Sequence, residues 1–230
     1  MQGREGAVAV FVRWPEPGQV MPSLIRRLGA EAAAQLYNAF IGDLIAGMPL
    51  SSYNGYLYAL DNVHGFRERF KGVHVRAQQG ANEGKRLLSC FEELLKTHPL
   101  AVIVGSSMPD LHPRMWKSAF EMLARRDVVV GPTTRGGIYL LGMRKPADVF
   151  RGIKWGTGTE LFTILENLRQ AKLNYGFFPT REKIEVYEDL PPLRRRLLRP
   201  MAPLTFATLQ MLGIGSEEES RSRNQESNPT

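Results

Sequence analysis

The segment from Ala101 to Met143 constrains the fold more than any other part of the chain. It reads AVIVGSSMPDL and, one predicted helix later, DVVVGPTTRGGIYLLGM. Each half starts with a short run of β-branched residues that ends at a glycine, and polar turn-forming residues follow. This pattern is typical of a strand buried in a parallel sheet that leads into a loop at a ligand site. The loop tips, however, carry Ser106, Ser107 and Arg135 instead of the acids expected at such a site.

The rest of the chain continues this alternation of strands and helices. Hydrophobic periodicity predicts strands at 7–13, 55–60, 73–78, 101–104, 128–130, 138–142 and 175–178, and helices at 31–48, 84–96, 113–125 and 159–172. Such an order predicts a three-layer α/β fold with a mostly parallel central sheet and helices on both faces. The loops after Phe11, Gly105 and Gly131 are then expected to open on the same side of the sheet. The predicted core contains Val10, Leu36, Phe40, Val102, Ile103, Val129, Leu140 and Leu141.

Two segments lack this regular pattern. Residues 14–23, WPEPGQVMPS, hold three prolines and a glycine and are predicted to be irregular. After residue 213 the chain is almost free of apolar residues, so burial cannot offset the entropy lost on ordering. We therefore expect a single domain over residues 1–213, which includes a basic helical extension at 191–213, and a disordered tail at 214–230.

Composition excludes several classes of protein. No apolar run approaches the roughly 18 residues of a membrane-spanning helix, and the N-terminus leads into a predicted strand, so we expect a cytoplasmic protein without a membrane span. Cys90 is the only cysteine, which rules out an intramolecular disulfide framework and a cysteine-rich zinc site. It falls in the apolar pattern of a predicted helix and is expected to be a buried or boundary thiol. The four histidines lie far apart, and none is predicted to bind a metal.

A net charge of +7 raises the question of an acidic partner. The densest basic cluster is Arg194, Arg195, Arg196 and Arg199, without aromatic or glycine-rich RNA-binding signatures beside it. We expect a solvated face of a C-terminal helix there, and nucleic acid is an unlikely partner. An anionic small molecule explains the excess charge equally well.

Four motifs and a tryptophan follow one another in a recognisable order. They are FVRWPEPGQV at 11–20, QGANEGKRL at 79–87, GSSMPDL at 105–111, GPTTRGGIYLLG at 131–142 and Trp155. Together, over roughly residues 7–190, they resemble small bacterial glycosyltransferases with a GT-A, nucleotide-diphospho-sugar-transferase fold, often labelled radical-SAM/selenodomain-associated transferase 1.

This resemblance implies a nucleotide or nucleotide sugar as ligand and magnesium or manganese as the family's cofactor. It also implies a set of nucleotide- and phosphate-binding residues: Arg13, Pro17, Gly18, Gln79, Gly80, Arg86, Gly105, Ser106, Ser107, Gly136 and Gly137.

The chain departs from the family at the charged positions of these motifs. Where the family has Lys-Thr-Arg after its first loop, this chain has Met21-Pro22-Ser23, which removes two cations suited to phosphate. Ser107 and Arg135 stand where the family has acids, and Glu185 alone keeps a carboxylate in the family's last acidic motif. A divalent cation needs hard oxygen ligands, usually carboxylates, so no metal cofactor is expected here.

Asp110 survives beside these substitutions. It is predicted to cap the helix beginning near Pro113, and metal binding is the alternative role. The candidate catalytic residues are accordingly Arg135, Asp110 and Glu185, none of them assigned to a chemical step.

Three interpretations remain open. The first is a degenerate family member that has lost or impaired metal-dependent transfer and binds a nucleotide, an unidentified protein partner or nothing small. The second is a metal-independent glycosyl- or nucleotidyltransferase in which Arg135 supplies positive charge to the departing phosphate, unless Arg135 is simply an exposed side chain on a surface turn. The third is a basic binding module that uses residues 194–199, which predicts steeply salt-dependent binding.

Overall fold

The structure is a computed structural model that describes residues 6–197 and 201–215. Arg199 and the expected tail beyond Gly215 lie outside the described residues. The described chain forms two compact units. We name them the sheet unit, made of residues 6–14, 48–105 and 112–183, and the helical unit, made of residues 15–47, 106–111 and the described residues from 184 to 215. The expectation of one domain stays a prediction.

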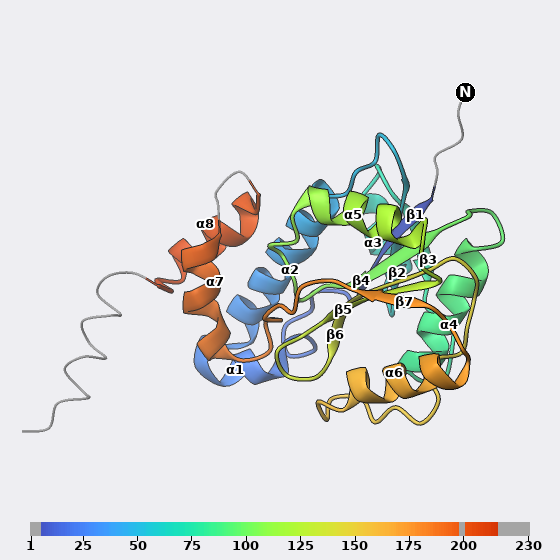
Figure 1. Cartoon of the computed structure of the whole chain (residues 1–230). Helices are drawn as coiled ribbons and strands as arrows, with labels where there is room; N and C mark the ends of the chain where they lie inside the picture. The colour runs from blue at the N-terminus through green and yellow to red at the C-terminus, as the bar shows by residue number, and fades with distance from the viewer. Residues whose placement is uncertain (1–5, 198–200, 216–230) are drawn as a thin grey trace, which may run out of the picture. The chain divides into compact units, whose positions relative to one another are not determined.

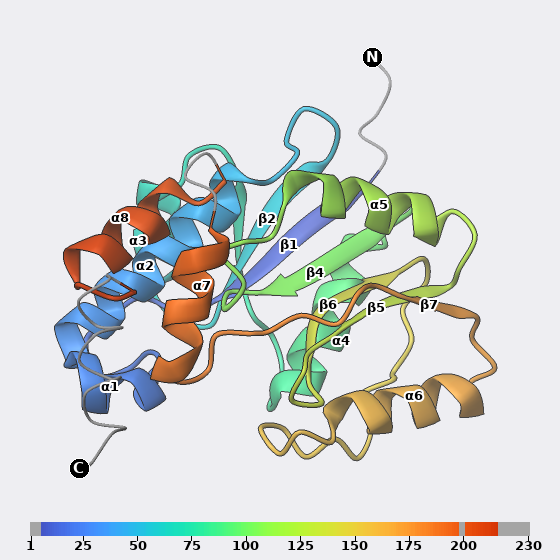
Figure 2. The same cartoon turned by 60° about the vertical axis from the view of Figure 1, so that its left-hand side comes forward.

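The sheet unit contains a seven-stranded sheet with the order β3-β2-β1-β4-β6-β5-β7 (Figures 1 and 2). The strands are β1 (Ala7–Val12), β2 (Asn54–Ala59), β3 (His74–Ala77), β4 (Ala101–Gly105), β5 (Val128–Pro132), β6 (Ile138–Met143) and β7 (Tyr175–Phe177). Only β6 runs antiparallel to its neighbours, β4 and β5. The sheet is therefore mixed and mostly parallel, as the sequence predicts.

Strand register places the main loops at one edge of the sheet. Phe11 of β1 lies opposite Gly105 of β4. Val104 and Gly131 both pair with Leu140 of the strand between them. The chain thus leaves β1, β4 and β5 on the same side, which confirms the predicted common direction of the three loops.

Helices cover both faces of this sheet. Apolar residues of α4 (Glu83–Leu94) and α6 (Glu160–Gln170) share one core cluster with Ala9, Ile103 and Leu141. On the other face, α5 (Pro113–Leu123) packs where Gly142 leaves room for Leu123, since a Cβ there would lie 2.9 Å from the leucine. Figure 2 shows α5 and the α4–α6 pair on opposite sides of the sheet.

All eight residues of the predicted core are buried, and Cys90 is buried as well, which confirms both expectations. The sheet unit also contains α3 (Val63–Arg69), which the sequence analysis did not predict.

The helical unit consists of α1 (Pro22–Leu28), α2 (Ala30–Ala46), the 3-10 turn η1 (Tyr187–Asp189), α7 (Leu190–Arg196) and α8 (Pro203–Met211). Its core is formed by Leu24, Leu36, Phe40, Ile184, Leu190, Leu193 and Leu209. The buried carboxylate of Asp43 accepts backbone hydrogen bonds from Leu204 (3.1 Å) and Thr205 (2.7 Å). Because these amides open α8, Asp43 satisfies the donors that a helix leaves unpaired at its N-terminus.

Two boundary predictions were wrong. The stretch 14–23 was expected to be irregular, yet α1 begins at Pro22, because proline fits the first turn of a helix, where no amide hydrogen is needed. The tail was expected to start at residue 214, yet Ile214 is 2% exposed and belongs to the core of the helical unit. Burial of its apolar side chain in this core stabilises the folded chain.

Candidate functional site

The turn after β5 is held mainly by its own backbone. Gly136 has a φ of 77°, and a Cβ on it would lie 2.0 Å from the carbonyl oxygen of Gly158. The hydroxyl of Thr133 accepts from the amide of Gly137 at 3.0 Å, and the amide of Thr133 donates back to the carbonyl of Gly137 at 2.9 Å. Arg135 is exposed on this turn, and its carbonyl would meet a Cβ on Gly158 at 2.7 Å. The charged side chain is thus presented by a tightly packed backbone.

A second loop at the same edge of the sheet leads into α4. The side chain of Asn82 accepts from the amide of Lys85 at 3.0 Å and caps the helix. Gly80 has a φ of 139°, and a Cβ on it would approach the amide nitrogen of Arg86 to 2.7 Å. Only glycine allows the chain to fold back this closely over the first turn of α4.

Four charged residues gather around the start of α4, and three of them were missed by the sequence analysis. Burial raises the pKa of Glu83, the nearby Lys183 and Arg86 lower it, and Glu160 raises it further, with a net upward shift. Glu160 is buried and accepts from the amide of Thr157 at 3.0 Å. The Nε of Arg86 is buried without a hydrogen-bond partner among the described residues. Charge is therefore concentrated here, although acidic and basic groups are mixed.

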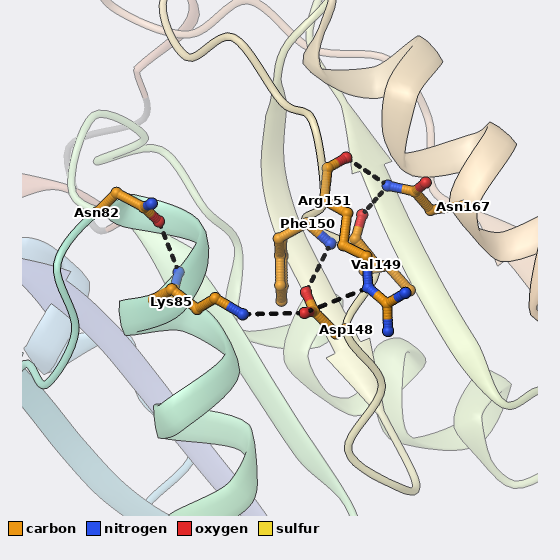
Figure 3. A network of polar contacts seen from close by, with 7 residues as sticks. All are labelled: Asn82, Lys85, Asp148, Val149, Phe150, Arg151 and Asn167. Carbon is orange, nitrogen blue, oxygen red and sulfur yellow. Dashed lines mark hydrogen bonds and ion pairs between the residues drawn. The ribbon is translucent and has the colours of Figure 1, made fainter.

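The loop between β6 and α6 is fastened to both of its neighbouring helices (Figure 3). Asp148 forms an ion pair with Lys85 of α4 at 3.1 Å and another with Arg151 at 3.5 Å. The side-chain amide of Asn167 in α6 donates to the carbonyls of Val149 and Arg151, each at 2.9 Å. Burial alone would raise the pKa of Asp148, but the hydrogen bond and charge of Lys85, with smaller effects of Phe150 and Arg151, hold it below its ordinary value.

The start of the first motif is fixed by an acid that the sequence analysis did not single out. Asp61 forms an ion pair with Arg13 at 3.4 Å and accepts from the amide of Trp14 at 2.6 Å. The indole of Trp14 packs edge-on against Phe66 at 5.1 Å between ring centroids. Arg13, predicted to bind phosphate, is therefore partly neutralised by Asp61.

Gln78 was also missed, because its neighbour Gln79 fits the family motif. Its side-chain amide donates to the carbonyls of Val12 at 3.2 Å and Tyr58 at 2.8 Å, whereas Gln79 is exposed. No periodic signal in the sequence separates the two glutamines.

In the helical unit, the loop after β4 is held by side chains and by a distant segment. The hydroxyls of Ser106 and Tyr37 lie 2.7 Å apart, and the carbonyl of Ser107 accepts from the amide of Ile184 at 3.1 Å. This last bond places residue 107 beside the residue that precedes Glu185. This bond therefore brings Ser107 and Glu185, two of the three positions where the resembled family has acids, close to each other.

Asp110 does not have the predicted capping role. Its carboxylate is 3% exposed and pairs with Arg196 of α7 at 2.9 Å. The cap of α5 is His112, whose Nδ1 accepts from the amide of Arg114 at 3.0 Å. The capping prediction was wrong because the sequence does not reveal a cation 86 residues away.

The remaining predicted residues of the first loop lie in the helical unit as well. Pro17 and Gly18 are exposed, and Gly18 has a φ of 83° with open space where a Cβ would stand. Met21 also adopts the left-handed conformation, at the start of α1. The loop thus contains two left-handed residues, and the positions 21–23 that follow it carry no cation.

The side chains of Ser107, Asp110 and Glu185 do not form a site suited to a divalent cation. Ser107 offers at most a neutral hydroxyl, Asp110 already neutralises a guanidinium, and Glu185 is the remaining acid among the family's metal positions. Across the parts of the chain that the structure describes, no group of three or more His, Cys, Asp and Glu residues could hold a metal ion. The convergence of Ser107 and Arg135 on one site stays a prediction.

The basic cluster is only partly a solvated face. Arg194 stacks on the ring of Phe206 at 3.6 Å, and Arg196 pairs with Asp110, whereas Arg195 is exposed. The expected solvated face is wrong for Arg194 and Arg196, because the packing of α7 within the helical unit directs them to internal partners. No helix among the described residues is long and apolar enough to cross a membrane.

Comparison with known proteins adds to this geometry. The model of a family described as "Uncharacterized protein conserved in bacteria (DUF2064)" matches residues 56–157, which is less than half of the chain. No curated protein matches. A solved structure described as "putative nucleotide-diphospho-sugar transferase", from Desulfovibrio desulfuricans G20, is 28% identical with a TM-score of 0.82. The match covers 90% of this chain and 94% of that one.

More distant structures share the fold alone. A cytidylyltransferase from Leptospira borgpetersenii serovar Hardjo-bovis (strain JB197) is 11% identical with a TM-score of 0.53, over 91% of this chain and 94% of that one. The 4-diphosphocytidyl-2C-methyl-D-erythritol synthase of Anaerococcus prevotii DSM 20548 is 11% identical with a TM-score of 0.52, over 90% and 96% of the two chains. The chain therefore has an α/β fold like that of nucleotidyltransferases and GT-A proteins, with a mixed, mostly parallel seven-stranded sheet.

Proposed function

We propose that this protein binds a nucleotide or nucleotide sugar on a transferase-like fold and has lost, or strongly impaired, metal-dependent transfer. The observation that carries the proposal is the state of the 106–111 loop. At the position where the resembled family has an acid, this chain has Ser107. The acid that the loop does contain, Asp110, is buried and pairs with Arg196.

The retained loop geometry supports the binding half of the proposal. Gly80 and Gly136 hold backbone conformations that a side chain would not tolerate, and both loops lie at the carboxyl edge of the sheet. Ligands of open α/β sheets bind at this edge. The similarity to the Desulfovibrio protein makes a nucleotide sugar the first ligand class to test.

The charge pattern supports the loss of metal-dependent transfer. A guanidinium in place of an acid repels a divalent cation by roughly 1 kcal/mol per unit charge even in water at contact distance, and by more where water is excluded. Arg135 is held at its position by the close packing of Gly136 against Gly158.

The position of Arg135 on this tightly packed turn favours one second candidate, a metal-independent glycosyl- or nucleotidyltransferase. A rigidly presented arginine could neutralise charge on a departing diphosphate without a metal ion. The basic binding module gains no such support, because Arg194 and Arg196 have partners inside the helical unit.

The test is a thermal-shift and calorimetric series with nucleoside diphosphates and nucleotide sugars, each with magnesium, with manganese and with chelator. A ligand at about 100 times its dissociation constant stabilises the native state by roughly 2.7 kcal/mol. We expect stabilisation by at least one nucleotide, equal in all three conditions. Chelator-sensitive hydrolysis or transfer by the wild-type protein would contradict the proposal, and turnover that survives chelator but disappears in Arg135→Ala would establish the second candidate.

Restoring the acids tests whether the two family positions belong to one site. Ser107→Asp combined with Arg135→Asp should raise manganese affinity by more than the two single changes together, because paired carboxylates bind a cation cooperatively. Ser107→Asp combined with Thr134→Asp is the matched control, since Thr134 is the exposed neighbour of Arg135. Equal manganese affinity in the two double variants would show that Arg135 does not face the site.

A further inference from the structure

The loop after β4 is held at both ends by one segment of the helical unit. At its start, the carbonyl of Ser107 accepts from the amide of Ile184 at 3.1 Å. At its end, Asp110 pairs with the Nε of Arg196 at 2.9 Å. Residues 184–196 therefore contact this loop twice, once through the backbone and once through a charge.

The segment that provides these contacts is itself firmly packed. Asp189 accepts from the amides of Glu185 at 2.8 Å and Val186 at 3.0 Å, which closes the turn before α7. Leu190 and Leu193 of α7 are fully buried in the core of the helical unit. Arg196 follows within the same helix, so its guanidinium is brought to Asp110 by helix packing.

The charges of this pair are matched and poorly accessible. Asp110 is the only acid in the 106–111 loop, and its side chain is 3% exposed. The side chain of Arg196 is 29% exposed and lies on the solvent side of the pair. A hydrated divalent cation would have to displace the guanidinium before it reached this carboxylate.

We propose that Arg196 is a built-in cation that holds the 106–111 loop in place of a divalent metal. It is a positioning residue: it neutralises Asp110 and fixes the loop through α7. This inference rests on the proposed metal-free function, but its test uses no nucleotide, so a failure to find a nucleotide ligand leaves it untouched.

The first test removes the guanidinium in the full-length protein. Arg196→Met removes the cation that pairs with the buried carboxylate of Asp110, so the melting temperature of the variant should fall, and manganese chloride should restore it. Manganese affinity, measured by electron paramagnetic resonance, should exceed that of the wild type by roughly tenfold or more, the scale on which a change beside a metal ligand alters affinity. Arg195→Met, on the exposed neighbour in the same helix, is the control and should match the wild type in both measurements.

Two further variants keep the proposal open to refutation if Arg196→Met does not fold. Arg196→Met with Asp110→Asn removes both charges, and should regain most of the lost melting temperature without a response to manganese. Asp110→Asn alone removes the carboxylate that pairs with Arg196, and inorganic phosphate should then stabilise this variant while leaving the wild type unchanged. The proposal is wrong if folded Arg196→Met binds manganese no better than Arg195→Met, if manganese binds wild-type Asp110, or if phosphate does not stabilise Asp110→Asn.

Discussion

The 131–137 turn of the sheet unit and the 106–111 loop of the helical unit follow β5 and β4, two parallel strands on either side of β6, yet they are held in different ways. The first depends on backbone contacts, with Gly136 packed against Gly158 and Thr133 bonded to Gly137. The second depends largely on side chains, through Tyr37 on Ser106 and Arg196 on Asp110, in addition to the backbone bond from Ile184 to Ser107.

The difference explains which substitutions each loop tolerates. Gly136 and Gly158 fix the backbone of this turn, and the side chain of Arg135 is exposed on it. In a loop fixed by an ion pair, loss of Arg196 would remove the guanidinium that pairs with the buried carboxylate of Asp110. A substitution at the tip of the first loop is therefore a local change, whereas a substitution of Asp110 in the second loop is coupled to α7.

The largest expected effect tests the backbone-held turn. Gly136→Ala would place a Cβ 2.0 Å from the carbonyl oxygen of Gly158, at a φ of 77°. We expect a loss of about 3 kcal/mol or more in the free energy of unfolding, because strain and a steric clash add. Denaturant unfolding monitored by circular dichroism measures it.

Gly152→Ala is the matched control for that change. Gly152 has a similar φ of 72° in the same unit but open space around its Cβ position. Its substitution should lower the free energy of unfolding by only about 1–2 kcal/mol, the strain of a left-handed residue. Equal losses in the two variants would show that the Gly136–Gly158 contact does not hold the turn.

A smaller effect is expected for the side-chain-held loop. Tyr37→Phe removes the hydroxyl that lies 2.7 Å from Ser106, and a single hydrogen bond of this kind contributes about 1 kcal/mol. Since Tyr37 is 6% exposed, water does not readily replace the partner. A double-mutant cycle of Tyr37→Phe and Ser106→Ala, by denaturant unfolding, should give a coupling free energy of about 1 kcal/mol. If the losses in free energy of unfolding caused by the two single substitutions simply add, this hydrogen bond does not help to hold the loop.

The same contrast decides what the sequence could predict. The β-branched runs and glycines of β4 and β5 predicted the sheet, its buried residues and the shared direction of its loops, because these depend on local pattern. The pairings of Asp110 with Arg196 and of Asp43 with α8 join residues 86 and about 160 positions apart, and no local pattern specifies them. The glycine-containing turns after these strands could therefore be predicted from the sequence, whereas the side chains that hold or neutralise the loops could not.

The smallest effect on the free energy of unfolding is expected at Asp148, whose side chain pairs with Lys85 and Arg151 within the sheet unit. Its pKa lies below the ordinary value of about 3.9, so the folded state favours the charged form. The stabilisation it provides is then present above about pH 4 and is lost as the pH falls through the lower, folded-state pKa.

Because Lys85 is 57% exposed, solvent screens the pair, and Asp148→Asn should lower the free energy of unfolding at pH 7 by less than about 1 kcal/mol. The difference between wild type and variant should shrink toward pH 3 and in high salt, as measured by denaturant unfolding at each pH. A difference that stays constant across this range would mean that the charge of Asp148 does not hold the loop, which would then depend on the side-chain amide of Asn167.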